Sequence, residues 1–254
     1  MHYLKGTCLH IIFYEEEFKL EKGYKWIRGH VILEKDKMIR QYLPETVLFS
    51  EDSLFQLLLK YNSVILKPSN GTGGKGIFKL TKANEKKFVL YRGTESSMFK
   101  NLEPVINIIN KQERLRKVKY LLQMCISLAH IKGKPFDIRV LLQRDEQQRW
   151  HVYGMQSRIA ADGKFVTNYH QGGALISVPK VFRYSLDMNE RQISWKQQEI
   201  ERIALRIANT ISNKFNSSLA GIDFGIDVNA KVWFIEHNPK PNFDLFAKML
   251  KRYG

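Results

Sequence analysis

The stretch NSVILKPSNGTGGKGIFKL, residues 62–80, is the most informative part of this chain. The run NSVILK predicts a strand, Pro68 ends it, and the run GIFKL resumes an extended pattern after a glycine-rich turn. Gly71, Gly73 and Gly76 match the spacing G-x-G-x-x-G, which is weak evidence when it stands alone. The residues on either side of the glycines therefore have to identify the loop.

Common phosphate-binding loops differ from this segment in their flanking residues. A dinucleotide-binding loop opens a helix, and a P-loop has Lys-Ser/Thr after its last glycine, whereas here Ile77 follows Gly76 and a strand continues. The kinase loop lies between two strands, but its lysine comes after the loop, whereas Lys67 comes before it. A lysine on a strand followed by flexible glycines suits phosphates, because backbone N–H groups can close over them. The alternative is a long glycine hairpin without a ligand.

A second segment, GIDFGIDVNAKVWFIEHN at residues 221–238, predicts a hairpin that carries carboxylates. Strand alternation puts Asp223 on the face opposite to the apolar side chains. If VNAK forms a four-residue loop, Asp227 pairs with Val232 and Asp223 pairs with Glu236.

This register predicts a metal site on the hairpin. Two directly opposed carboxylates repel each other unless a cation lies between them. Asp223, Glu236 and Asn238 offer hard oxygen ligands of the kind that Mg²⁺ takes. Asp227 lies beside the turn, where an aspartate commonly serves the turn itself.

The rest of the pattern predicts an α+β order rather than a regular alternation of strand and helix. Residues 46–60 read as a loop followed by a helix that Ser53 or Asp52 could cap, and a long amphipathic helix is expected within residues 192–215. Residues 98–118 read as mixed helix and loop, and a short helix is expected at the C-terminal end. Further strands are expected at residues 120–126, 136–143, 150–159, 219–227 and 232–237.

Together the motifs resemble the ATP-grasp superfamily, most closely its YheC/YheD-like branch and more distantly the RimK-type glutamate ligases. The resemblance covers residues 23–246, and its motifs are KW at 25–26, YLPET at 42–46, ILKP at 65–68, FDIRV at 136–140, NYHQGG at 168–173, AGIDF at 220–224 and IEHNPKP at 235–241. It implies an ATP-grasp fold of two α+β lobes with ATP between them and with the preceding domain largely absent. The implied division is a short segment at 1–22, an N-terminal lobe with a glycine-rich lid at 23–119, and a C-terminal lobe with a metal site at 120–254.

The resemblance also implies roles for individual residues. It assigns nucleotide binding to Lys25, Lys67, Gly71, Thr72, Gly73, Gly74, Gly76, Gln123, Met124, Cys125, Asp137 and Asn168. In this set, residues 123–125 are the linker whose backbone reads adenine, Asp137 lies near the ribose, and Asn168 contacts the triphosphate. Arg139 and Arg158 face the phosphates and the acyl substrate as the catalytic cations, and Asp223, Glu236 and Asn238 bind Mg²⁺.

Some of these assignments have simpler alternatives. Lys25 could be an ordinary surface lysine, and Arg139 and Arg158 could be structural ion-pair partners. His170 fits a loop-orienting role better than that of a base. Val166 stands where RimK-type ligases have an arginine, so one phosphate contact is absent or comes from another residue.

The implied activity is that of a carboxylate–amine ligase that uses Mg·ATP and forms an acyl phosphate. An ATP-grasp kinase that phosphorylates a hydroxyl, and a non-catalytic structural or binding protein with the same fold, are the alternatives. The partners implied are ATP, a carboxylate and an amine.

Composition narrows the partners and the compartment. The 254 residues include 41 Lys+Arg and 25 Asp+Glu, for a formal net charge of +16. This charge favours an anionic or peptidic co-substrate. The alternative is that it only reflects a lysine-rich proteome. No nucleic-acid module is visible. No apolar run is long enough for a membrane helix, and the start lacks a signal-peptide pattern. The two cysteines, Cys8 and Cys125, lie far apart, so a disulfide framework is not expected and a cytoplasmic location is.

Overall fold

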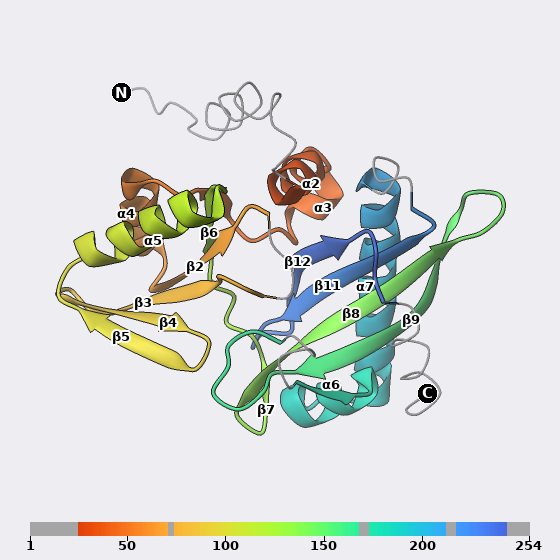
Figure 1. The fold of residues 1–254 in the computed structure, drawn as a ribbon. Coiled ribbons are helices and arrows are strands. Elements are labelled where there is room, and N and C mark those ends of the chain that lie inside the picture. Colours follow the sequence, from red (N-terminus) through yellow and green to blue (C-terminus); the bar gives the residue numbers. More distant parts are fainter. Residues whose placement is uncertain (1–24, 71–73, 168–172, 212–216, 243–254) are drawn as a thin grey trace, which may run out of the picture.

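The computed structural model describes residues 25–70, 74–167, 173–211 and 217–242, with the backbone alone described for residues 25–28. In these residues the chain forms two antiparallel sheets that lie next to each other, each with helices on one face (Figure 1). The mixed helix and strand order confirms the expected α+β class. In this part of the chain no helix is both long and apolar enough to cross a membrane.

The first sheet carries the glycine-rich loop between two neighbouring strands. Its strand order is β1 (Thr46–Leu48), β6 (Tyr120–Met124), β2 (Ser63–Pro68), β3 (Phe78–Asn84), β4 (Lys87–Arg92) and β5 (Glu95–Phe99). Helices α4 (Glu51–Lys60) and α5 (Glu103–Arg116) cover one face of this sheet (Figure 1). Leu54, Leu57 and Leu58 of α4 are buried in the core of this lobe, as their helical spacing predicted.

The predicted cap of one helix in this lobe was wrong. Ser50 caps α4, because its side chain accepts from Ser53 N–H while the Ser53 side chain accepts from Ser50 N–H. Ser53 is therefore the third helical residue of a capping box and not the cap. The segment 98–118, expected to be mixed helix and loop, holds the 14-residue helix α5 between short non-helical stretches, with Pro104 in the first turn of the helix.

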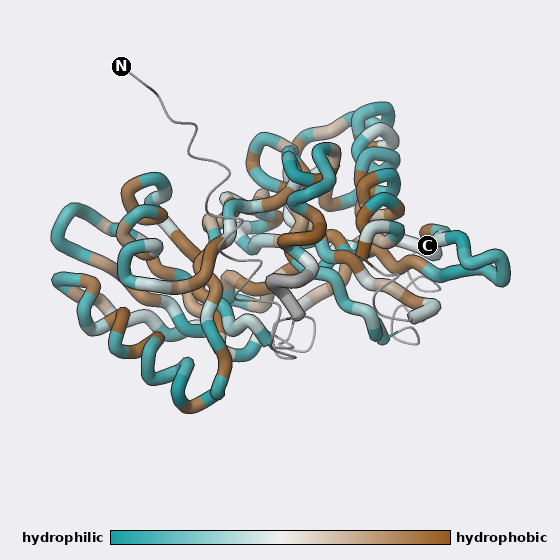
Figure 2. Tube along the Cα trace, turned by 90° about the horizontal axis from the view of Figure 1, so that it is seen from above, coloured by the Kyte–Doolittle hydropathy of each residue, from teal (hydrophilic) through white to brown (hydrophobic). Residues whose placement is uncertain are grey.

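The second sheet forms the larger lobe. Its strand order is β10 (Ala174–Ile176), β9 (Trp150–Ile159), β8 (Lys134–Arg144), β11 (Leu219–Ile226) and β12 (Val232–Asn238), with β7 (His130–Ile131) paired to β8. Helices α6 (Val178–Leu186) and α7 (Glu190–Ile211) pack on one face, and the buried stripe of α7 includes Ile200, Ile203, Ala204, Ile207 and Ile211. This confirms the predicted apolar stripe. Figure 2 shows the tip of the β8–β9 hairpin, which extends away from the core, as hydrophilic.

The division into lobes differs from the predicted boundaries at 23 and 120. Helices α2 (Lys25–Glu34) and α3 (Lys37–Arg40) belong to the second lobe, because Leu33 and Ile39 are buried in its core. Strand β6 belongs to the first sheet, where it lies between β1 and β2. The chain therefore starts its described part on the second lobe, builds the first lobe, and returns after β6. The predicted segment 1–22 and the predicted C-terminal helix lie outside the described residues.

Candidate nucleotide and metal site

Four polar residues form a row across the face of the second sheet that α7 leaves open. The strand register pairs Gln156 of β9 with Arg139 of β8, Arg139 with Asp223 of β11, and Asp223 with Glu236 of β12. Directly paired residues of antiparallel strands point to the same face, so the row is continuous. On β11, Ile222 points the other way and is fully buried in the core.

The predicted pairing of Asp223 with Glu236 is confirmed, although the hairpin closes differently. Ile226, and not Asp227, pairs with Val232, and a bulge beside Asp223 restores the register. The Asp227 carboxylate accepts N–H bonds of 2.9 Å from both Asn229 and Lys231, so it belongs to the turn. Asp227 therefore has the turn role that its position suggested.

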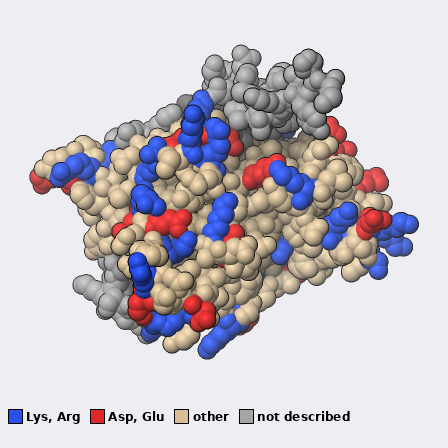
Figure 3. Space-filling view, turned by 180° about the vertical axis from the view of Figure 1, so that it is seen from behind, with Lys and Arg blue, Asp and Glu red and all other residues tan. Residues whose placement is uncertain are grey.

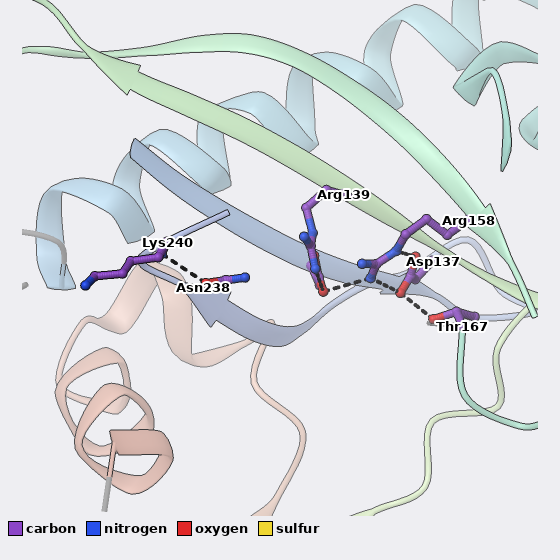
Figure 4. Close-up of polar contacts among 7 residues, drawn as sticks. Asp137, Arg139, Arg158, Thr167, Asn238 and Lys240 are labelled. Atoms are coloured by element: carbon purple, nitrogen blue, oxygen red, sulfur yellow. Dashed lines mark hydrogen bonds and ion pairs between the residues drawn. The ribbon is translucent and has the colours of Figure 1, made fainter. Parts of the chain in front are cut away.

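Asp223 and Asp137 form an ion-pair network with two arginines (Figure 4). Arg139 donates to both oxygens of Asp223, with Nη2 2.6 Å from Oδ2, and Arg158 Nη2 lies 2.7 Å from the same Oδ2. Arg158 also donates to both oxygens of Asp137, and Thr167 donates to Asp137 as well. Arg139 and Arg158 thus form structural ion pairs here, which was the simpler alternative for both residues. The side chain of Asp137 faces this network rather than an open ribose site.

Burial and charge act in opposite directions on these carboxyl groups. Burial alone would raise the pKa of Asp223, but Arg139 and Arg158 outweigh it and hold the pKa below its usual value. For Asp137, burial outweighs Arg158 and raises the pKa. The guanidinium groups therefore favour the ionised form of Asp223 more strongly than that of Asp137, and Asp223 contacts both arginines.

Glu236 lies beside Asp223 in a different environment. Burial, together with the charge of Asp223, raises the pKa of Glu236 to about 7, although Arg139 and Lys67 oppose the shift. Among the residues that the structure describes, none donates a hydrogen bond to its carboxylate. Lys67, on β2 of the other lobe, is 5% exposed, and burial lowers its pKa to about 7 against the attraction of Glu236. The two lobes thus bring a buried lysine and a partly buried carboxylate close together.

A hydrogen-bond chain within the first sheet orients Lys67. Lys67 Nζ donates to Gln123 Oε1 at 3.0 Å, and Gln123 Nε2 donates to Thr46 Oγ1 at 2.6 Å. Met124 N–H and Cys125 N–H donate to backbone carbonyls of the first lobe at 2.9 and 3.2 Å. These two N–H groups of the linker are therefore already engaged within the first lobe. Burial raises the pKa of the Cys125 thiol, in agreement with a residue that is not a nucleophile.

The corner between α5 and β6 holds both ends of the glycine-rich loop. Ser69 N–H donates to the Lys119 carbonyl at 2.7 Å, and Tyr120 Oη donates to the Gly76 carbonyl at 2.9 Å. Gly76 has a φ of +81°, and a Cβ at this position would lie 2.8 Å from Cζ of Arg116. This glycine is therefore required by its conformation, and an added Cβ would also displace the guanidinium end of the exposed Arg116 side chain.

Gly76→Ala should destabilise the protein by more than the roughly 1 kcal/mol typical of a left-handed alanine, because Arg116 and Tyr120 must also move. Gly93→Ala is the matched control, since Gly93 has a φ of +63° and nothing within 4 Å of its added Cβ. Chemical denaturation of both variants measures the difference. Equal losses for the two variants would mean that the contact with Arg116 does not constrain the loop.

The donor set at Glu236 fits Mg²⁺ in its chemistry. Within the described residues no group of three His, Cys, Asp or Glu side chains is arranged around one point, but Mg²⁺ commonly binds through one or two carboxylates together with phosphate oxygens. Both Asp223 oxygens already accept from guanidinium groups, whereas no guanidinium group of the described residues donates to the Glu236 carboxylate. Asn238 Oδ1 accepts from Lys240 N–H at 3.0 Å (Figure 4). Glu236 is thus the strongest ligand candidate of the predicted three.

Several predicted residues cannot be placed at this site. Gly71, Thr72, Gly73, Asn168 and His170 lie outside the described residues. Lys25 begins α2 on the second lobe, and its side chain is not described. Gly74 lies near the end of the glycine-rich loop with a φ of +72°.

Three contributors were missed by the sequence reasoning, namely Thr167, Thr46 and Gln156. Thr167 is a donor to a buried aspartate, and Thr46 ends the chain of hydrogen bonds from Lys67. Strand alternation could have found Gln156, because it lies two residues before Arg158 on the same face of β9.

Lys67→Met should raise the stability of the nucleotide-free protein, and the gain should shrink as the pH rises from 7 towards 10.5. The folded pKa of about 7 lies below the ordinary value of 10.5, so between these values the unfolded chain binds more protons and wild-type stability increases with pH. Thermal melts of both proteins across this range measure the effect. Lys87→Met, at an exposed lysine of β4, is the control and should show no such trend. A gain that does not change with pH would contradict the burial of a titrating lysine.

Comparison with known proteins identifies related families and folds. A family model described as YheC/D like ATP-grasp matches residues 22–253. The endospore coat-associated protein YheD of Bacillus subtilis (strain 168) is 27% identical over 229 residues, which cover 88% of this chain and 49% of that protein. The endospore coat-associated protein YheC of the same organism is 22% identical over 219 residues, which cover 85% of this chain and 59% of that protein. The chain thus spans about half the length of the curated relatives it matches.

Two solved structures resemble the fold. N5-carboxyaminoimidazole ribonucleotide synthetase from Thermotoga maritima has a TM-score of 0.50 at 13% identity, with coverage of 95% of this chain and 50% of that chain. N5-carboxyaminoimidazole synthetase from Staphylococcus aureus, complexed with ADP, has a TM-score of 0.50 at 12% identity, with coverage of 85% and 47%. At these identities the likeness concerns the fold alone.

Proposed function

This chain belongs to the YheC/D-like ATP-grasp family, and from this premise we propose that it is a cytoplasmic Mg·ATP-dependent carboxylate–amine ligase. ATP would lie between the two sheets, with Lys67 on one side and the row from Arg139 to Glu236 on the other. The first lobe would supply the glycine-rich lid over the phosphates. The family and the fold support nucleotide binding, and the ligase reaction is our proposal.

The observation that carries the proposal is the presence of Lys67 and Glu236 on different lobes, each buried enough to shift its pKa and each within the electrostatic influence of the other. Lys67 is buried and oriented by Gln123. Glu236 is partly buried and without a hydrogen-bond donor among the described side chains. A magnesium–phosphate group would bring negative charge next to the lysine and positive charge next to the carboxylate.

In the proposed reaction a carboxylate oxygen of the first substrate attacks the γ-phosphorus of ATP, and the bond to the ADP oxygen breaks. The amine then attacks the acyl carbon, phosphate leaves with the bonding electrons, and the nitrogen loses its extra proton. Lys67 neutralises phosphate charge, and Arg139 and Arg158 lie where negative charge develops, so this chain contributes positioning and electrostatics. Mg²⁺, when bound at Glu236 with Asp223 and Asn238, would supply further charge neutralisation.

A screen for ADP release over libraries of carboxylates and amines tests the reaction. We expect ADP and phosphate release that requires both a carboxylate and an amine. ADP release that requires a hydroxyl compound and yields no phosphate would instead identify a kinase. Nucleotide binding without turnover on any pair would identify a non-catalytic protein with this fold. The Lys67→Met variant serves as the control for contaminating ATPases.

We also propose that one co-substrate is anionic. Residues 75–119 contain 12 Lys and Arg against four Asp and Glu. On the face seen from behind, Lys and Arg side chains are interspersed with Asp and Glu rather than gathered in one patch (Figure 3). The excess would act as a general attraction for a negatively charged substrate.

The KM of the true co-substrate should rise steeply with salt, while kcat changes less. The reason is that the screening length falls from about 10 Å at 0.1 M to about 3 Å at 1 M ionic strength. ATP is the internal control, because its proposed pocket between the lobes is less exposed to screening. A co-substrate KM that stays constant from low to high salt would assign the positive charge to compositional background.

A further inference from the structure

Gln156 ends the row of polar residues on the open face of the second sheet. It is 3% exposed, and its Oε1 atom has no hydrogen-bond partner among the residues that the structure describes. Its cross-strand neighbour Arg139 directs Nε and Nη2 to Asp223, so these donors are turned away from Gln156. A buried acceptor without a donor is unfavourable, which makes Gln156 the place in the row where a ligand can supply one.

Resting on the proposed function, we propose that Gln156 is a specificity residue that accepts a hydrogen bond from the amine co-substrate. The ionised carboxylate and the triphosphate carry only acceptors, so neither can satisfy Oε1. The amine is the reactant whose attacking group carries N–H donors. The adenine end of ATP is expected at the linker of residues 123–125, which belongs to the other lobe.

The position of Gln156 in the row agrees with this role. Gln156 and Glu236 lie three strand spacings apart, on the order of 14 Å between backbones. Arg139 stands between them, one strand from Gln156. A phosphate near Glu236 and an acyl group near Arg139 would thus leave the Gln156 end of the row for the amine.

Ser157 shows that an unpartnered polar atom alone does not define this site. Its hydroxyl is also fully buried and without a partner. However, Ser157 pairs with Ile138, a residue of the hydrophobic core, so it points to the opposite face of β9. Among the described strand residues of the second sheet, Gln156 alone combines an unsatisfied atom with the face that carries Arg139 and Asp223.

The experiment uses the full chain and the carboxylate–amine pair that gives the highest ADP release with the wild type. Gln156→Met keeps the length of the side chain and removes the acceptor, and Gln156→Glu keeps an acceptor. Ser157→Ala is the matched control on the core face. We expect Gln156→Met to raise the KM of the amine about tenfold, the effect of one lost hydrogen bond, with the KM of ATP and of the carboxylate unchanged.

Further readouts separate this role from a structural one. Gln156→Glu should keep the KM of the amine near the wild-type value, and Ser157→Ala should leave all three KM values unchanged. Hydroxylamine trapping of the acyl phosphate should give wild-type rates of hydroxamate formation with Gln156→Met, because activation of the carboxylate does not involve this residue. If Gln156→Met does not fold, Gln156→Asn, which withdraws the acceptor, should give the same selective rise.

An unchanged KM for the amine, or an equal rise in the KM of all three substrates, would overturn the role of Gln156 and leave the proposed ligase intact. A wild-type protein that releases ADP with no carboxylate–amine pair would overturn the ligase itself, and the role of Gln156 with it.

Discussion

Glu236→Gln is expected to lower turnover about 1,000-fold, the effect of losing several kcal/mol of charge stabilisation in a metal–phosphate site. The substitution keeps the size of the side chain and its place in β12, but removes the charge that would bind Mg²⁺. In the nucleotide-free protein the same change should preserve or raise the melting temperature, because burial already disfavours the ionised carboxyl group. A large loss of activity in a protein that is at least as stable as the wild type is the combined result expected.

ADP release with the best substrate pair, and thermal melting without nucleotide, measure the two effects. Glu146→Gln, at an exposed position in the β8–β9 turn, controls for the change of charge alone. Retention of most of the activity by Glu236→Gln would remove Glu236 from the metal site.

Unlike Glu236→Gln, Asp223→Asn is expected to destabilise the protein, and to lower the free energy of unfolding by about 3–5 kcal/mol. Asp223 is buried and accepts from both Arg139 and Arg158, so its neutralisation leaves two enclosed guanidinium groups with too little negative charge. The lowered pKa of Asp223 sets the pH dependence. The full loss of unfolding free energy is expected at neutral pH. It should diminish as the pH falls below 3.8, the ordinary pKa of an aspartate, because the carboxyl group of the unfolded chain then becomes protonated.

Urea denaturation at several pH values measures this loss. Asp145→Asn is the matched control, since Asp145 also pairs with two basic side chains, Arg149 and His151, but lies at the surface, where such pairs contribute little. An Asp223→Asn variant as stable as the control variant would show that the network around Asp223 does not hold the second sheet together.

The strand pattern of the sequence was enough to predict the carboxylate hairpin and the loop after Lys67. Both depend on local rules, namely alternation along a strand and the conformational freedom of glycine. The bulge beside Asp223 was not predictable in this way. It compensates for the observed pairing of Val232 with Ile226, where the predicted four-residue loop required pairing with Asp227. The predicted pair of Asp223 and Glu236 was therefore correct although the register at the turn was wrong.

The lobe boundary and the ion pairs could not be read from local patterns. Residues of α2 and β6 join their cores through contacts with segments far away in the chain, as Leu33 does with the core of the second lobe. The arginines of FDIRV and of β9 gave no sign of which aspartate each would pair with, because that depends on the order of β9, β8 and β11 in the sheet. The role of Gln123 as a partner of Lys67 likewise follows from the placement of β6 beside β2.

The central claim, that Mg·ATP binds between Lys67 and Glu236, is tested most directly by calorimetric titration of the wild-type chain with a non-hydrolysable ATP analogue, with and without Mg²⁺. The predicted result is one binding site per chain whose affinity depends on Mg²⁺, with that dependence lost in Glu236→Gln and binding itself lost in Lys67→Met. Absence of binding at millimolar analogue, or equal affinity in the wild type and both variants, would contradict the claim.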